Sequence, residues 1–159
     1  MDKASASLGG LDIVVCNAGC SASLPPGSET PEEWLRMFAA NLWSTTNTVE
    51  AAVAHLAERG GTVVCISSIC GIERIDGAPV PYSVAKAAVN SYVNTISPVL
   101  AEMGIRINAV APGNVTFPGS RWEIRARDRP EETRAMLERD VPLRRFGEPS
   151  DVAHCVAFL

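Results

Sequence analysis

Tyr82 and Lys86 are four residues apart, a spacing that places both side chains on one face of a helix. An isolated tyrosine is a poor acid or base at neutral pH, because its ordinary pKa is about 10. A nearby lysine ammonium favours the phenolate and lowers that pKa. We therefore predict that Tyr82 exchanges a proton with an alcohol or a carbonyl compound.

Ser68 is a second candidate, because it ends an apolar run shortly before Tyr82. Its hydroxyl could donate a hydrogen bond to a substrate oxygen whose charge changes during the reaction. Pairs of residues four apart are common on helices, so Tyr82 and Lys86 alone are a weak signal. Their position after a strand end that carries serine is what favours a catalytic role.

Three short runs rich in β-branched residues are predicted to be the strands that position these side chains: Leu11–Cys16, Thr62–Ile66 and Ile105–Val110. Runs of this kind are typical of parallel strands buried on both faces of a sheet. Small or polar residues follow each run, namely Asn17-Ala18-Gly19, Ser67-Ser68 and Ala111-Pro112-Gly113. Ligands of doubly wound sheets bind beyond the carboxyl ends of the strands, so these residues are expected to face one crevice.

Long helices are predicted between the runs, over residues 30–58 and 82–103, and a third begins near Pro149 and continues to the end of the chain. The first opens with a capping threonine followed by a proline, and glycines end the first two. Pro98 is expected to kink the second helix. The alternation of strand and helix indicates an α/β fold with a doubly wound parallel sheet.

Residues 114–145 interrupt this alternation and are rich in Arg, Glu and Pro. Their place after the third run suggests a lid over the substrate, although a plain surface loop is the alternative. The charged run 121–132 is expected to be a solvated face. Trp122 is the aromatic residue of this segment that we expect to contact substrate, unless it belongs to the core or an interface.

The composition sets limits on the class of protein. With 159 residues, 47% of them apolar, the chain can form one domain with a hydrophobic core. A formal charge of −4 argues against nucleic-acid binding, and no apolar run approaches the roughly 20 residues of a membrane helix.

Five cysteines without a CxxC pair and only two histidines argue against a metal site. Cys16 and Cys65 are predicted to be small buried hydrophobic residues. No secretory segment is apparent, so a cytoplasmic location is expected.

The sequence resembles the short-chain dehydrogenase/reductase family over nearly its whole length. Six motifs in the family's order carry the resemblance: Leu11-Asp12-Ile13-Val14-Val15-Cys16-Asn17-Ala18-Gly19, Asn41-Leu42, Ile66-Ser67-Ser68, Tyr82-Ser83-Val84-Ala85-Lys86, Asn108-Ala109-Val110-Ala111-Pro112-Gly113 and Arg145-Phe146-Gly147-Glu148-Pro149-Ser150-Asp151-Val152-Ala153. The resemblance implies a Rossmann-type fold, NAD or NADP as cofactor and a small alcohol or ketone as substrate.

The resemblance also implies a role for particular residues. Tyr82 would be the general acid/base, and Lys86 would lower its pKa and bind the nicotinamide ribose. Ser68 would orient the substrate carbonyl, and Asn41 would hold a water that relays protons towards Lys86. Further cofactor contacts would come from Asn17, Ala18, Gly19, Pro112, Gly113, Val115 and Thr116, the last of which stands one residue earlier than in many members.

Plainer interpretations exist for several of these residues. Asn41 could be a polar helix residue that serves structure, since buried asparagines usually do. Ser67 and Ser68 could cap a strand end. Pro112-Gly113 is an ordinary turn dipeptide.

The chain also departs from the family. It has no TGxxxGxG phosphate turn, and Cys16 replaces a usual asparagine. We therefore expect residues 1–159 to be a single catalytic domain truncated at both ends, a partial Rossmann-type sheet without the first strands. Such a sheet would leave an exposed edge and uncovered faces, and its stability would be marginal.

Two functions are thus open. One is an NAD(P)-dependent oxidoreductase that interconverts a secondary alcohol and a ketone. The other is a non-catalytic remnant that acts by associating with a full-length relative. Family members commonly pair through the helices that correspond to 30–58 and 82–103, so a homo-oligomer is expected. A sugar epimerase or dehydratase shares the Tyr–Lys pair, but Arg145-Phe146-Gly147-Glu148-Pro149 looks more like the simple reductases.

Overall fold

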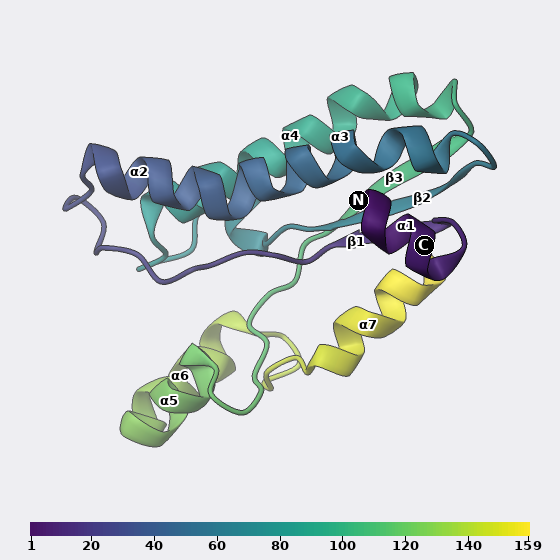
Figure 1. The fold of residues 1–159 in the computed structure, drawn as a ribbon. Helices are drawn as coiled ribbons and strands as arrows, with labels where there is room; N and C mark the ends of the chain where they lie inside the picture. Colours follow the sequence, from purple (N-terminus) through teal and green to yellow (C-terminus); the bar gives the residue numbers. More distant parts are fainter. The chain divides into compact units, whose positions relative to one another are not determined.

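A computed structural model describes all 159 residues of the chain (Figure 1). They form two compact units, Met1–Ala111 with Leu159, and Pro112–Phe158.

The first unit contains a parallel sheet of three strands, β1 (Ile13–Cys16), β2 (Gly61–Ile66) and β3 (Ile105–Val110), in the order β1-β2-β3. The predicted α/β class and parallel sheet are confirmed. The strand expected over Leu11–Cys16 is shorter than predicted and begins at Ile13.

The helix predicted over 30–58 is present, but it is not uniform. It consists of α2 (Pro31–Phe38), a π-helical segment at Ala39–Trp43, and α3 (Ser44–Leu56). The Thr30 hydroxyl accepts a hydrogen bond from the Glu33 amide at 3.3 Å, which confirms the predicted cap.

The second long helix, α4, spans Val80–Ala101 and not 82–103. It starts earlier than predicted, with Pro79 as the N-cap, because Pro81 suits the first turn of a helix, where a missing amide hydrogen costs nothing. Helical structure continues through Pro98. A short helix, α1 (Asp2–Leu8), precedes β1.

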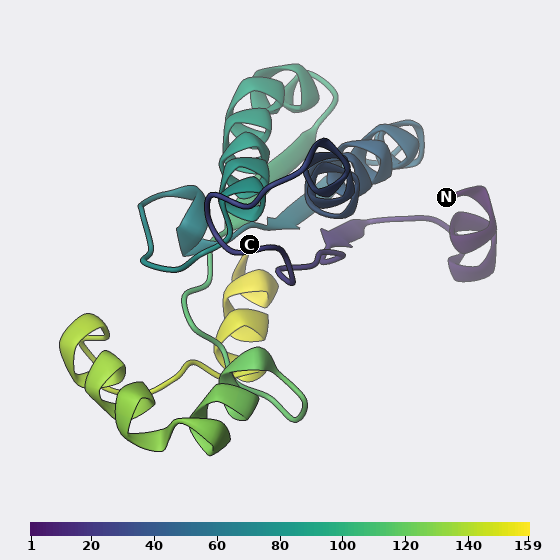
Figure 2. The same ribbon diagram turned by 90° about the vertical axis from the view of Figure 1, so that its left-hand side faces the viewer.

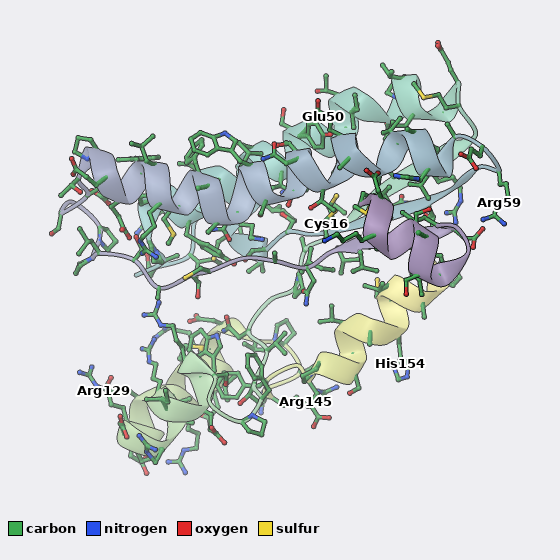
Figure 3. The ribbon with its side chains drawn as sticks, in the orientation of Figure 1. Cys16, Glu50, Arg59, Arg129, Arg145 and His154 are labelled. Atoms are coloured by element: carbon green, nitrogen blue, oxygen red, sulfur yellow. The ribbon has the colours of Figure 1, made fainter.

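The core of the first unit lies between the sheet and the helices that cover one of its faces (Figures 1 and 2). Figure 3 shows Cys16 on β1 and Glu50 on α3, where Glu50 points away from the sheet. Cys16 and Cys65 are buried, as predicted. The larger core residues are Val49, Leu56, Val63, Val89, Val93, Leu100, Ile105 and Ile107.

The expectation that all three strands are buried on both faces is wrong for β3, where Arg106 and Ala109 are exposed, and for β1. Val14 is buried there, whereas Ile13 is 65% and Val15 is 44% exposed. Successive side chains of a strand point to opposite faces, so one face of β1 is covered and the other is not. The expected uncovered sheet surface is therefore present at this strand, while β2 is buried along most of its length.

The second unit is helical and consists of α5 (Arg121–Asp128), α6 (Pro130–Asp140) and α7 (Pro149–Phe158). The charged side chains of α5 are exposed, as expected for a solvated face. Trp122 packs against Phe146, with ring centroids 5.4 Å apart.

No helix in the structure combines the length and the apolar character that crossing a bilayer requires.

Candidate active site

Tyr82 lies in the first turn of α4 and is half-buried. The Nζ atom of Lys86 is 5.9 Å from the centroid of its ring. Burial raises the pKa of Tyr82, and a hydrogen bond with the Ser68 side chain acts in the opposite direction. Burial outweighs that hydrogen bond, so the pKa of Tyr82 in the chain alone lies above its ordinary value, and the lowering expected from Lys86 stays a prediction.

Lys86 is buried, with 4% of its surface exposed. Its ammonium donates a hydrogen bond to the carbonyl oxygen of Ile66 at 2.7 Å, at the end of β2. Burial lowers the pKa of Lys86, because the charged form loses its hydration. The lysine is thus held at the carboxyl end of the central strand, where the sequence predicted the site.

Ser68 directly follows Ser67 after β2 and is 7% exposed. Its hydroxyl oxygen accepts a hydrogen bond from the Cys70 amide at 3.2 Å and so caps the 3-10 turn Ile69–Gly71. The plainer capping role is therefore present, and the same side chain also hydrogen-bonds with Tyr82.

Asn41 is fully buried in the π-helical segment. Its amide donates hydrogen bonds to the carbonyl oxygens of Cys20 and Met37, both at 2.9 Å, and its Oδ1 accepts one from the Cys20 amide at 3.1 Å. The side chain therefore clamps the segment after β1, in keeping with the structural interpretation. π-Helical turns occur often at functional sites, so the relay role stays a prediction.

Gly19 lies close to both Asn41 and Lys86. A Cβ atom at Gly19 would lie 2.9 Å from Asn41 Oδ1 and 3.4 Å from Lys86 Nζ, so a larger residue would crowd the Asn41 side chain. Asn17, Ala18 and Gly19 are themselves exposed at the end of β1. The Lys86 ammonium has three N–H donors, and one of them is bonded to the Ile66 carbonyl oxygen. The remaining donors, beside the exposed backbone of Gly19, suit a hydroxyl-bearing ligand such as the ribose of a cofactor.

Pro112, Gly113, Val115 and Thr116 follow β3 and belong to the second unit. Within it, Val115 pairs with Gly147, and the Thr116 amide donates a hydrogen bond to the Gly147 carbonyl at 2.9 Å. Their predicted cofactor contacts remain predictions.

Two residues of the site were missed in the sequence. Gly71 packs on the backbone of α4, and the Asn90 side chain hydrogen-bonds to Gly71. Asn90 stands four residues after Lys86, on the helix face that Tyr82 and Lys86 share, and this spacing could have revealed it.

Comparisons with known proteins agree with this geometry. The family model described as Enoyl-(Acyl carrier protein) reductase matches residues 1–159. The 3beta-hydroxysteroid dehydrogenase 1 of Eggerthella lenta is 34% identical, with 99% of this chain and 59% of that enzyme covered. An oxidoreductase of the short chain dehydrogenase/reductase family from Burkholderia thailandensis superimposes with a TM-score of 0.85 at 32% identity, covering 99% of this chain and 61% of that one.

The chain belongs to the short-chain dehydrogenase/reductase family. Another solved structure similar to this member of the family is ElxO with NADP bound, at a TM-score of 0.87 and 29% identity, covering 99% of this chain and 63% of ElxO. The chain spans about three fifths of the length of the relatives it matches. This confirms the family resemblance, the partial Rossmann-type sheet and the expectation that the chain corresponds to part of a family member.

Proposed function

We propose that this chain carries the catalytic residues of an NAD(P)-dependent oxidoreductase that interconverts a secondary alcohol and a ketone, with Tyr82 as general acid/base. The observation that carries the proposal is the meeting of Ser68, Tyr82 and Lys86 at the carboxyl end of β2. A hydroxysteroid dehydrogenase and an NADP-bound structure among the similar proteins support the substrate class and the cofactor.

Each side chain has a chemical task in this proposal. A bound nicotinamide would supply or accept the hydride at the substrate carbon. Tyr82 is protonated at neutral pH, because the ordinary pKa of tyrosine is about 10 and burial raises it further, and this form donates a proton to an alkoxide as it forms. The Ser68 hydroxyl donates a hydrogen bond to the same oxygen. In oxidation the phenolate takes the proton back, and the buried Lys86 ammonium stabilises that phenolate.

The cofactor would lie along Asn17, Ala18 and Gly19, with Lys86 bound to a ribose hydroxyl. Pro112, Gly113, Val115 and Thr116 would add contacts near the nicotinamide, and residues 114–145 would form the substrate lid. Asn41 would serve the proton relay from its place in the π-helical segment.

The test is binding of NADH and NADPH to the purified chain, followed by nicotinamide fluorescence. The chain has two lysines, so Lys86→Met is matched by Lys3→Met, which changes an exposed residue of α1. We expect saturable binding that Lys86→Met abolishes and Lys3→Met preserves. Absence of binding by the folded chain would instead favour a non-catalytic chain that acts through association with a full-length relative.

Association is also expected through the two long helices. Four large apolar side chains on these helices are more than two fifths exposed, namely Leu35, Trp43, Val84 and Val99. We propose a homo-oligomer that buries them. Sedimentation of the chain beside Leu35→Asp tests this, and a monomer at all concentrations would contradict it.

A further inference from the structure

The turn that carries Ser68 is fastened to α4 at both of its ends. At the first end, the buried Ser67 hydroxyl donates a hydrogen bond to the Lys86 carbonyl at 3.2 Å. At the other end, a Cβ atom on Gly71 would come within 2.6 Å of the Lys86 carbonyl carbon and 2.7 Å of the Ala87 nitrogen, so backbone packs directly on backbone. Ser68 lies between these two attachment points.

Asn90 completes the second attachment. Its Nδ2 atom donates a hydrogen bond to the Gly71 carbonyl oxygen at 3.1 Å. Asparagine is a weaker helix former than alanine or leucine, so its presence in the middle of α4 is explained by this contact and not by helix propensity. The residue lies one turn beyond Lys86 and two turns beyond Tyr82 on the same face.

The turn can transmit this constraint to Ser68 because it is closed by its own hydrogen bonds. The Gly71 amide donates to the Ser68 carbonyl at 2.9 Å, and the Cys70 amide donates to the Ser68 hydroxyl at 3.2 Å. A displacement of Gly71 therefore displaces Ser68. Without the Asn90 hydrogen bond, the bond from Ser67 would remain at the first end of the turn, and the end at Gly71 would have lost its own.

We propose that Asn90 is a positioning residue that holds the Ser68 hydroxyl at Tyr82 through the Gly71 carbonyl. This inference rests on the proposed function, because the contact between Ser68 and Tyr82 matters for catalysis only if both residues act on the substrate oxygen. The contact itself is a property of the chain alone, so it can be tested without substrate or cofactor.

The chain has two tyrosines, and a Tyr92→Phe background leaves Tyr82 as the only phenol. Its ionisation is followed by the absorbance of the phenolate. We expect Ser68→Ala to raise the pKa of Tyr82 by on the order of one pH unit, since a hydrogen bond to the phenolate is lost. Asn90→Ala should raise it in the same direction. The double variant should show no more than the Ser68→Ala effect, because both changes remove one contact.

Two further variants control for packing and for position. Asn90→Leu keeps a similar volume and a good helix former but lacks the amide donor, so it should reproduce the effect of Asn90→Ala. Asn94→Ala changes an exposed asparagine one turn further along α4 and should leave the titration unchanged. Circular dichroism establishes that each variant is folded.

The outcomes distinguish a failure of the positioning role of Asn90 from a failure of the proposed function. A rise with Ser68→Ala but none with either Asn90 variant overturns the positioning role and leaves the proposed function standing. A lower stability of the Asn90 variants with an unchanged titration does the same, because it assigns Asn90 a structural role only. No rise with Ser68→Ala removes the contact between Ser68 and Tyr82, and with it both the inference and the role proposed for Ser68.

Discussion

The ammonium group of Lys86 donates its hydrogen bond to the carbonyl oxygen of Ile66, and this bond ties the second turn of α4 to the end of β2. A buried charge is stable only when such partners replace its lost hydration. Lys86 is therefore part of the fold as well as of the candidate site, and its removal should be visible in stability before any activity is measured.

The stability of the chain should depend on pH through Lys86. Burial lowers its pKa in the folded chain, so between that value and the ordinary 10.5 the unfolded chain binds more protons. The free energy of unfolding of the native chain should therefore rise with pH across this window, relative to that of Lys86→Met. Urea unfolding at a series of alkaline pH values measures the difference. Lys3→Met should follow the native chain, and a difference for Lys86→Met that stays constant with pH would contradict the assignment.

Tyr82→Phe should separate binding from chemistry. The variant keeps the ring that packs at the start of α4 but loses the hydroxyl that exchanges the proton. We expect unchanged NADPH binding and a ketone turnover lowered about 10²- to 10⁴-fold, the usual contribution of one general acid. Fluorescence titration and NADPH consumption measure the two quantities. A variant that turns over ketone as fast as the native chain would show that another group donates the proton.

The sequence predicted the elements that depend on local patterns. Short β-branched runs identified β2 and β3 to within a residue, and the capping pattern at Thr30 identified the start of α2. It did not predict the π-helical segment, whose Asn41 side chain hydrogen-bonds to Cys20, 21 residues away, because contacts between distant residues leave no local pattern.

The same limit applies to the site. Helical spacing correctly placed Tyr82 and Lys86 on one face, but it could not show that the ammonium reaches Ile66, which lies on another element. Burial, which raises the pKa of Tyr82, is likewise a tertiary property. The contacts of Gly71 and Asn90 could not be predicted, because the packing of Gly71 and the hydrogen bond from Asn90 exist only when the turn after β2 lies against α4.

Gly71→Ala should destabilise the chain. The added methyl group would lie within 2.8 Å of three backbone atoms of Lys86 and Ala87, and backbone cannot move aside without bending α4. Overpacking of this kind costs about 1–3 kcal/mol. Gly113→Ala is the matched control, because nothing lies near its Cβ position and its backbone is not left-handed. Thermal or urea unfolding compares the two, and equal stabilities would mean that the turn does not pack on α4 as described.

Asn41→Ala should loosen the segment after β1 that carries Gly19. Asn41 is fully buried, and its side chain hydrogen-bonds to the Cys20 amide, the Cys20 carbonyl and the Met37 carbonyl. The change leaves these three backbone groups without that partner. Polar groups left unpaired in the interior cost about 1–3 kcal/mol, so the free energy of unfolding should fall by at least about 2 kcal/mol.

Hydrogen exchange of residues 17–22 should become faster in the same Asn41→Ala variant, because the Cys20 amide loses its acceptor. Asn47→Ala, an exposed asparagine on α3, should change stability by less than about 0.5 kcal/mol and leave that exchange unaltered. If Asn41→Ala were as stable as Asn47→Ala and exchanged as slowly, Asn41 would not be the clamp. Its burial beside Gly19 and Lys86 would then favour the proton relay as its main role.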